Sequence, residues 1–381
     1  MTQIIDADTH LMEPATVYLD HIDPRHRDEA LVVECDDRGW PWLTHRGNRL
    51  FRIDSHTPGH PELIGEQQRR YAEGGAWQEA EHPIADPWQP TERIANLIRN
   101  EVDASILFPN LGLGWGERLS ANPQALFANL AAYNTWLLEL LPVCEQRLFP
   151  AATLSLRDLD WFCAELDRVA KAGCKLAMIS PAPVDGRALA HPDFDRAWAA
   201  IQDHDMTLCF HVSNIALPLD PAWYALDPEP ANKLMDTAFL YLAPAVALAS
   251  LIAHGKLEEF PRLRIGVFEL SAGWVPGFLM HLDGAFHFYT QQRGHPLAKL
   301  NMRPSQYFKR QVRVNAFALE GAAHLMDLAG PEIFMWGSDY PHAEGMSQPS
   351  WPRYRRTQPR ELTDAEAAAL GGGNAAFLLS I

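Results

Sequence analysis

The segment IIDADTH, residues 4–10, decides how this sequence is interpreted. It begins as a short apolar run, predicted as a strand over residues 4–8, and it is closed by Asp8 and His10. Residues two apart in an extended chain point to the same side, so both polar side chains are expected together at the strand end. Seven more runs of this kind follow, at residues 104–109, 148–154, 174–179, 206–211, 264–269, 311–315 and 333–337.

Helical segments separate most of these runs. Residues 124–141, for example, place apolar side chains on one stripe with a period near 3.6. Strand–helix alternation repeated about eight times is typical of a closed parallel barrel. The sequence therefore predicts an α/β protein, a (β/α)₈ TIM barrel in one domain that spans residues 1–381.

A long insertion interrupts this rhythm after the first strand. Residues 20–90 are rich in Pro, Gly, His, Arg and Trp and show weak periodicity. Their aromatic side chains give them much to bury, which favours an ordered lid or rim over a disordered linker. The last segment, residues 363–381, is predicted as a closing helix that begins at the cap-like Thr363.

The composition excludes several classes of partner. The net charge is −16, and nucleic acids and anionic membranes are bound through Lys and Arg, so neither is expected. The sequence predicts no membrane span, because no apolar run approaches the roughly 18 residues that a span needs. The N-terminus lacks the basic and apolar stretches of a signal peptide, which predicts a cytosolic protein. A homodimer through the insertion is compatible with the sequence but not required by it.

Polar residues recur where barrel strands end, and active sites of such barrels are built at that face. His211 closes the fifth strand and Asp339 follows the eighth. Together with Asp8 and His10 they make a plausible ligand set for Zn²⁺ or Fe²⁺, with Mn²⁺ also compatible. Each residue alone has a structural alternative, such as a backbone hydrogen bond or a helix cap. Their shared placement at strand ends favours the metal.

The landmarks IIDADTHLMEP (residues 4–14) and FMWGSDYPHAEG (residues 334–345) resemble those of a known family. They are similar to the aminocarboxymuconate-semialdehyde decarboxylase-like branch of the amidohydrolase superfamily, and weaker matches cover residues 3–345 apart from 20–90. The resemblance implies the barrel, a divalent metal, and decarboxylation or hydrolysis. It places Asp8 and His10 on the ligand pair of strand one and His211 on the ligand of strand five. Asp339 falls on the aspartate of strand eight, which binds metal and takes a proton from metal-bound water.

One position departs from that family. Its decarboxylases carry a His after strand six, where this sequence has Glu269. A carboxylate cannot supply the N–H of a histidine, but it can ligate a metal or act as a base. The resulting set of Asp8, His10, His211, Glu269 and Asp339 could hold one or two ions. The alternative is that Glu269 pairs with a nearby Arg or His.

Five other residues are weaker candidates. Asn214, Trp115, Trp274 and His342 lie in expected strand-end loops, where they contact substrate or merely pack the loops. His342 could also orient Asp339. Lys175 lies in the fourth strand, where the wider superfamily sometimes uses a carboxylated lysine, but a solvent-facing or helix-paired lysine is the better expectation.

The leading functional hypothesis from the sequence is hydrolysis, because Glu269 replaces the histidine of the decarboxylases while the other four expected ligands are all present. Metal-activated water attacks a small, fairly apolar carbonyl substrate such as an ester, thioester, lactone or C–C cleavable diketone. Asp339 is the expected base, and Glu269 and His211 are the other expected catalytic residues. The alternative is a non-oxidative decarboxylase of an aromatic or enoic acid, and a third is a barrel that binds a small molecule without turnover.

Overall fold

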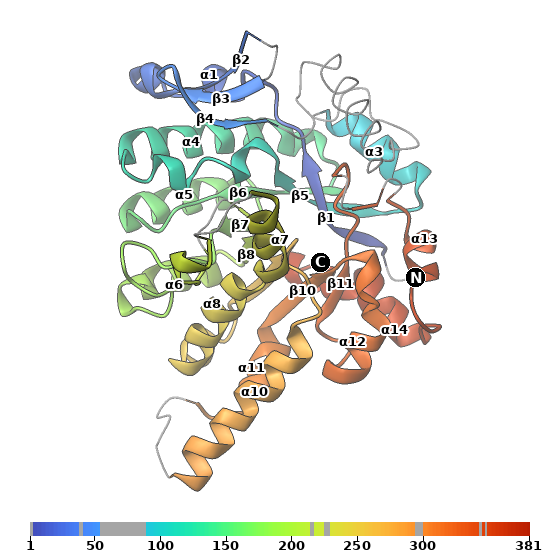
Figure 1. Cartoon of the computed structure of the whole chain (residues 1–381). Coiled ribbons are helices and arrows are strands. Elements are labelled where there is room, and N and C mark those ends of the chain that lie inside the picture. Colours follow the sequence, from blue (N-terminus) through green and yellow to red (C-terminus); the bar gives the residue numbers. More distant parts are fainter. Residues whose placement is uncertain are drawn as a thin grey trace.

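Eight parallel strands form the main sheet of the computed structural model, which describes residues 3–37, 41–53, 89–213, 217–224, 229–293, 300–342, 345–346 and 349–381 (Figure 1). In sheet order the strands are β1 (Ile5–Leu11), β5 (Ala104–Pro109), β6 (Leu148–Thr153), β7 (Leu176–Ile179), β8 (Thr207–His211), β9 (Arg264–Phe268), β10 (Val312–Ala316) and β11 (Phe334–Trp336). Each strand lies on a run that the sequence analysis predicted. The expected (β/α)₈ barrel is therefore confirmed.

Backbone hydrogen bonds close the barrel between its first strand and the segment after its last. The N–H of His10 donates to the carbonyl of Tyr340, and the N–H of Asp339 donates to the carbonyl of Asp8, both at 2.8 Å. Thr9 and Tyr340 form a parallel bridge at the same place. The two chain segments that carry Asp8, His10 and Asp339 are thus joined directly at the mouth of the barrel.

Helices surround the strands (Figure 1). A typical one is α5, where Asp158 caps the N-terminus by accepting from the N–H groups of Asp160 and Trp161, and whose buried face packs onto the sheet. The described helices are α1 (Val17–His21), α3 (Pro90–Arg99), α4 (Pro123–Leu140), α5 (Leu159–Lys171), α6 (Asp195–Asp203), α7 (Glu229–Phe239), α8 (Leu242–Ala253), α9 (Lys256–Glu259), α10 (Val275–His287), α11 (Pro304–Gln311), α12 (Ala322–Ala329), α13 (Trp351–Arg356), α14 (Asp364–Ala368) and α15 (Asn374–Leu379).

The C-terminal helix α15 forms a plug at the end of the barrel where the strands begin. Leu378 and Leu379 of α15 are fully buried, in one cluster with strand residues such as Ile5, Leu176 and Phe268. Thr363 caps the segment before it, where its hydroxyl accepts from the N–H of Glu366 at 3.3 Å. The expected closing segment is present, although it is divided into α14 and α15.

The described part of the insertion forms a small antiparallel sheet that the sequence analysis did not foresee. Its strands are β2 (Leu31–Cys35), β3 (Pro41–His45) and β4 (Asn48–Arg52). Asn129 of α4 anchors the sheet, because its side-chain oxygen accepts from Leu31 N at 2.9 Å and its side-chain nitrogen donates to Glu29 O at 2.7 Å. Residues 38–40 and 54–88 lie outside the described residues, so the role as a lid stays a prediction.

One helical stretch is apolar enough to pass the length and composition test for a membrane span, contrary to the sequence expectation. It covers Leu234–Ala253, with a mean hydropathy of 1.6 in its most apolar window, of which 39% is buried. Leu248, Leu251 and Ile252 from this stretch lie in the hydrophobic core, as in core helices of barrels. The feature is weak evidence for a membrane, and the absence of a membrane partner stays a prediction.

The plug predicts a stability effect. We expect Leu378→Ala to lower the free energy of unfolding by about 2–5 kcal/mol, because Leu378 is 0% exposed and its truncation leaves a cavity. Leu319→Ala is the matched control, since Leu319 is 93% exposed and its loss should change stability by less than about 0.5 kcal/mol. Urea unfolding measures both, and equal effects would contradict the role of the plug.

Candidate metal centre

The five predicted ligands converge at the mouth of the barrel. Asp8 and His10 lie near the end of β1, His211 ends β8, Glu269 directly follows β9, and Asp339 follows β11. All five are buried, and Glu269 is the most exposed at 9%. The structure therefore brings together side chains that lie more than 300 positions apart in the sequence.

The donor atoms lie as close together as the ligands of one ion. His10 Nε2 is 3.1 Å from Asp339 Oδ1 and 3.2 Å from Glu269 Oε2. His211 Nε2 is 3.3 Å from Glu269 Oε2 and 3.5 Å from Asp8 Oδ1. Two ligands bound to one divalent ion at about 2.1 Å lie about 3.0 Å apart at a ligand–metal–ligand angle near 90° and about 3.6 Å apart near 120°. The spacing therefore fits a shared cation.

The two imidazoles present their unprotonated nitrogens to this cluster. His10 Nδ1 lies 3.0 Å from Pro109 O, and His211 Nδ1 lies 2.9 Å from Val212 O. A carbonyl oxygen can only accept, so we assign the proton of each neutral ring to Nδ1. The lone pair of each Nε2 then faces the carboxylates, which is the tautomer that a metal-binding histidine needs.

Two acidic residues reach the cluster through a left-handed backbone. Glu269 has φ 51° and Asp339 has φ 55°, a region that residues other than glycine rarely adopt. Each turns the chain immediately or shortly after a strand, which returns its side chain to the mouth of the barrel. Such conformations are costly and tend to be found at functional sites.

The segment of β1 that carries Asp8 contains a shift in strand register. The register of β1 against β5 shifts between Asp6 and Thr9. The side chain of Asp6 binds backbone groups: its Oδ1 accepts from Ser338 N at 2.9 Å and from Asp8 N at 3.3 Å. Burial raises the pKa of Asp6 to about 7, against the hydrogen bonds from Ser338. Asp6 thus ties the backbone of one ligand to the segment that carries Asp339.

A buried arginine supports the same segment. Arg93 of α3 is 2% exposed, and its guanidinium lies 5.3 Å from the centre of the Tyr340 ring. Burial lowers the pKa of Arg93, and the negative charge of Asp6 opposes that effect. Sequence reasoning missed both Asp6 and Arg93, although both lie within the family landmarks.

The carboxyl of Glu13 holds the neighbouring loop. It is fully buried and accepts from the backbone N–H groups of Asn110, Leu111 and Gly112 at 3.0–3.1 Å. The side-chain oxygen of Asn110 in turn lies 2.9 Å from His342 Nε2. Glu13 was also missed, and its place in the motif IIDADTHLMEP was the available signal.

His342 links Asp339 to this loop. Its Nδ1 lies 3.0 Å from Asp339 Oδ1, and its ring packs against His10 with centroids 3.9 Å apart. Burial and His10 lower the pKa of His342, but the carboxylate of Asp339 outweighs them and the net shift is upward. His342 therefore lies where it can orient Asp339, and its predicted contact with substrate stays a prediction.

The donor set fits a cation. Within the described part of the chain, four buried atoms of the cluster have no hydrogen-bond partner: His10 Nε2, His211 Nε2, Glu269 Oε2 and Asp339 Oδ2. Burial, followed by the negative charge of Asp339, raises the pKa of Glu269 well above its ordinary value. Imidazole nitrogens and carboxylate oxygens that lack partners in a dry site are the ligands that divalent transition metals take.

The remaining sequence candidates have other surroundings. Trp115 is 1% exposed and donates its indole N–H to Tyr18 at 2.8 Å, which supports a packing role. Trp274 is partly exposed and stacks against Tyr241 with centroids 6.3 Å apart. Asn214 lies outside the described residues.

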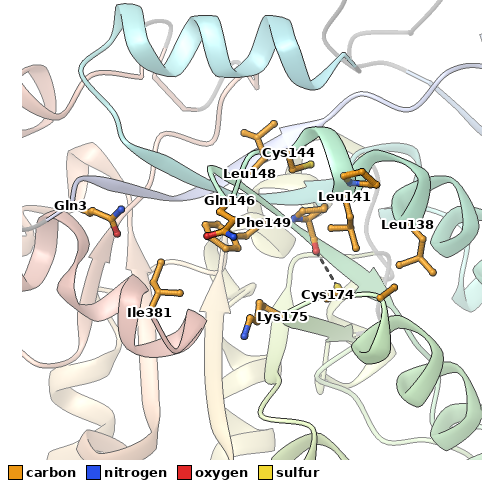
Figure 2. A pocket seen from close by; sticks show the side chains of 14 residues that line it. Gln3, Leu138, Leu141, Cys144, Gln146, Leu148, Phe149, Cys174, Lys175 and Ile381 are labelled. Carbon is orange, nitrogen blue, oxygen red and sulfur yellow. Dashed lines mark hydrogen bonds between the residues drawn. The ribbon is translucent and has the colours of Figure 1, made fainter.

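Lys175 lies at the opposite end of the barrel from the cluster. It directly precedes β7 and lines a pocket of about 720 Å³ together with Phe149, Gln146 and Ile381 (Figure 2). A residue at the start of a strand is remote from the mouth where the strands end. This placement does not suit a carboxylated-lysine bridge and agrees with the alternative of a peripheral lysine.

Several known proteins share this fold. The family model described as amidohydrolase matches residues 5–381. The chain is similar to an amidohydrolase from Mycobacterium avium subsp. paratuberculosis K-10, with a TM-score of 0.78, 23% identity and 99% of each chain covered. It is also similar to 5-carboxyvanillate decarboxylase from Sphingomonas paucimobilis, with a TM-score of 0.65, 19% identity and 100% of each chain covered.

A further similar structure is a dihydroxybenzoic acid decarboxylase from Polaromonas sp. JS666 with bound manganese and the inhibitor 2-nitroresorcinol. Its TM-score is 0.62 at 15% identity, with 100% of this chain and 97% of that chain covered. No curated protein matches the chain. At these identities the structures show the shared fold alone.

The raised pKa of Glu269 predicts a pH dependence of metal binding. The stability that its protonation contributes to the metal-free protein is present below the ordinary Glu pKa and is lost as pH rises through the raised pKa. Added Mn²⁺ should therefore raise the melting temperature more at pH 8 than at pH 5. At pH 8, free metal a hundredfold above Kd should raise the free energy of unfolding by about 2.7 kcal/mol. Glu269→Gln should show a smaller, flatter increment, and a pH-independent increment in the wild type contradicts the assignment.

Proposed function

This chain belongs to the amidohydrolase family, and we propose that it is a metal-dependent, non-oxidative decarboxylase of a small aromatic or enoic acid. The observation that carries the proposal is the convergence of two imidazole lone pairs with three carboxylates at the barrel mouth. The choice of decarboxylation over hydrolysis is supported by the similar structures, which include carboxy-lyases for carboxyvanillate and dihydroxybenzoic acid.

We propose a divalent cation as the cofactor, with Mn²⁺ as the first choice. Three carboxylates beside two imidazoles suit Mn²⁺ or Fe²⁺ better than Zn²⁺, and a similar decarboxylase binds manganese. When bound, the ion would act as a Lewis acid that binds the acidic substrate and stabilises the negative charge that develops on it. The residues that would hold it are Asp8, His10, His211, Glu269 and Asp339.

The chain itself supplies the proton that replaces the lost carboxyl group. The bond between the substrate carbon and the carboxyl group breaks, carbon dioxide leaves, and the electron pair left on that carbon takes up a proton. We assign the delivery of this proton to Asp339 and His342, whose Oδ1 and Nδ1 atoms lie 3.0 Å apart. The side chain of His342 is 10% exposed and that of Asp339 is 0% exposed, so His342 can exchange the proton with solvent.

Glu269 is a ligand in this account and not a donor to the substrate. Its Oε2 lies 3.2 Å and 3.3 Å from the Nε2 atoms of the two histidines, as a third carboxylate of the same set. The position of the absent family histidine then carries an additional ligand, so the replacement of that histidine does not by itself favour hydrolysis over decarboxylation.

Hydrolysis is the second candidate function, and the acid-rich donor set favours it. Asp339 would then accept a proton from water during attack on an ester, thioester, lactone or C–C cleavable diketone. The two reactions differ in product, because only decarboxylation releases carbon dioxide from a free acid.

The proposed reaction is tested by its product. Mn²⁺-loaded protein should release carbon dioxide from one or more members of a panel of hydroxybenzoic and enoic acids. We expect Asp339→Asn to lower kcat by about 10²–10⁴-fold, since it removes the group that passes on the proton. Ester or thioester cleavage without carbon dioxide release from any acid would contradict the proposal and support the second candidate.

Substitutions of Glu269 distinguish a metal ligand from a proton donor at this position. Glu269→Gln should lower Mn²⁺ affinity by at least roughly tenfold, whereas Glu269→His should retain a nitrogen ligand and lose less. Calorimetric titration with Mn²⁺ measures both variants without an activity assay. Full metal affinity in Glu269→Gln, with only turnover lost, would show that Glu269 acts on the substrate.

A further inference from the structure

A second pocket lies at the same end of the barrel as the metal cluster. It has a volume of about 280 Å³ and is lined by residues that follow β7, residues that follow β8, and one face of α8. No residue of its lining carries a charge, and Ser250 contributes the one hydroxyl side chain. Its walls include Pro181, Leu189, Leu217 and Ala247.

The strand register places this pocket beside a metal ligand. Ile179 of β7 pairs with Phe210 of β8, so the following residues, Ser180 and His211, continue side by side. Neighbouring strands are about 4.8 Å apart and consecutive Cα atoms 3.8 Å apart. The first wall residue, Pro181, therefore begins within about 10 Å of the backbone of His211.

A hydrogen bond joins the two loops at this point. Ser180 Oγ lies 3.2 Å from Ser213 Oγ, and Ser213 is two residues beyond His211. The loop that leaves the metal ligand and the loop that opens the pocket are thus tied together. A molecule that extends from the metal cluster past His211 would reach this pair of loops.

The face of α8 toward the pocket is apolar, and it passes from the buried residues Ala243 and Ala247 to the exposed Val246. Ala243, Val246, Ala247 and Ser250 recur at helical spacing on that face. Val246 is 53% exposed, whereas Leu248 on the core side of the same helix is 0% exposed. An apolar guest would remove this surface from water, which is favourable in proportion to the area covered.

The size of the pocket sets the size of the guest. A dry cavity of about 150 Å³ accepts one benzene ring, so about 280 Å³ accommodates an aryl ring with a small alkyl group, or a branched alkyl chain. Tyr241, which caps α8, and Trp274 form a stacked pair on the same stretch of rim. Among the described residues, the lining of the pocket itself is aliphatic apart from Ser250.

We propose that this pocket holds an apolar substituent of the substrate, so that the preferred acid carries an aryl or alkyl group on the side away from its carboxyl group. The proposal rests on the proposed function, because it places the acidic end of the substrate at the cation. It makes the residues of the loop after β7 and of α8 the determinants of specificity.

The test compares binding of two acids to the Mn²⁺-loaded protein by calorimetry. Biphenyl-3-carboxylate or biphenyl-4-carboxylate should bind at least tenfold more tightly than benzoate, because the second ring leaves water. Ala247→Leu fills the pocket and should abolish this preference while benzoate affinity stays within twofold. Ala188→Leu repeats the test in the loop after β7. Ala188 lines the pocket but is exposed, so a larger side chain there should not disturb the packing of the core.

Ala253→Leu is the matched control, since Ala253 is an exposed residue of α8 that does not line the pocket. It should keep the full preference for the biphenyl acid. Equal affinities for biphenyl acids and benzoate in the wild type, or equal losses in all three variants, would overturn the pocket assignment.

Turnover of the same acids separates this proposal from the proposed function. If no acid releases carbon dioxide but the biphenyl preference is present and is lost in Ala247→Leu, the decarboxylase assignment fails and the pocket assignment stands. If carbon dioxide is released without any dependence on the apolar group, the decarboxylase assignment stands and the pocket assignment fails.

Discussion

The structure at the mouth of this barrel depends on the repulsion among three buried carboxylates. Two imidazole lone pairs face the same point and add to the negative potential there. Two like unit charges about 4 Å apart repel by roughly 4 kcal/mol even at an effective dielectric constant near 20. The protein supplies no lysine or arginine contact to relieve Glu269 or Asp339 among the ion pairs of the described residues. A divalent cation, a proton on Glu269 or a protonated His342 beside Asp339 can compensate this charge. A site that needs a cation to be stable is well suited to bind an anionic acid through that cation.

The rest of the fold can be understood as the frame for this cluster. Parallel strands end at one face, so Asp8, His211 and Glu269 meet there without any long connection. The left-handed backbone at Glu269 and Asp339 and the shifted register of β1 then aim the side chains inward. Behind the ligands, a second layer formed by Asp6, Arg93, Glu13 and His342 holds the three chain segments in place. Supporting residues of this kind set the orientation of ligands and their affinity for metal.

Much of this frame could be predicted from the sequence, for a physical reason. Barrel strands are short apolar runs, and polar residues directly after such runs have few roles other than in the site, so Asp8, His10, His211 and Asp339 stood out. The β2–β4 sheet did not, because a strand such as β2 is buried at one end and exposed at the other and shows no clear alternation. For Trp115 the sequence left substrate contact and loop packing open, because a large aromatic residue in a loop gives no sign of which way it packs. The use of Glu269 as evidence for hydrolysis rested on residue type alone, whereas its distances to His10 and His211 are also those expected between ligands of one cation.

The central claim, that five side chains surround one cation, is tested most directly by diffraction from crystals of the Mn²⁺-loaded protein at the manganese absorption edge. The account predicts an anomalous peak at the barrel mouth, about 2.0–2.3 Å from the Nε2 atoms of His10 and His211. It also predicts that oxygens of Asp8, Glu269 and Asp339 complete the coordination. An ordered cluster without a peak, or a peak elsewhere with the five side chains unmoved, would contradict it.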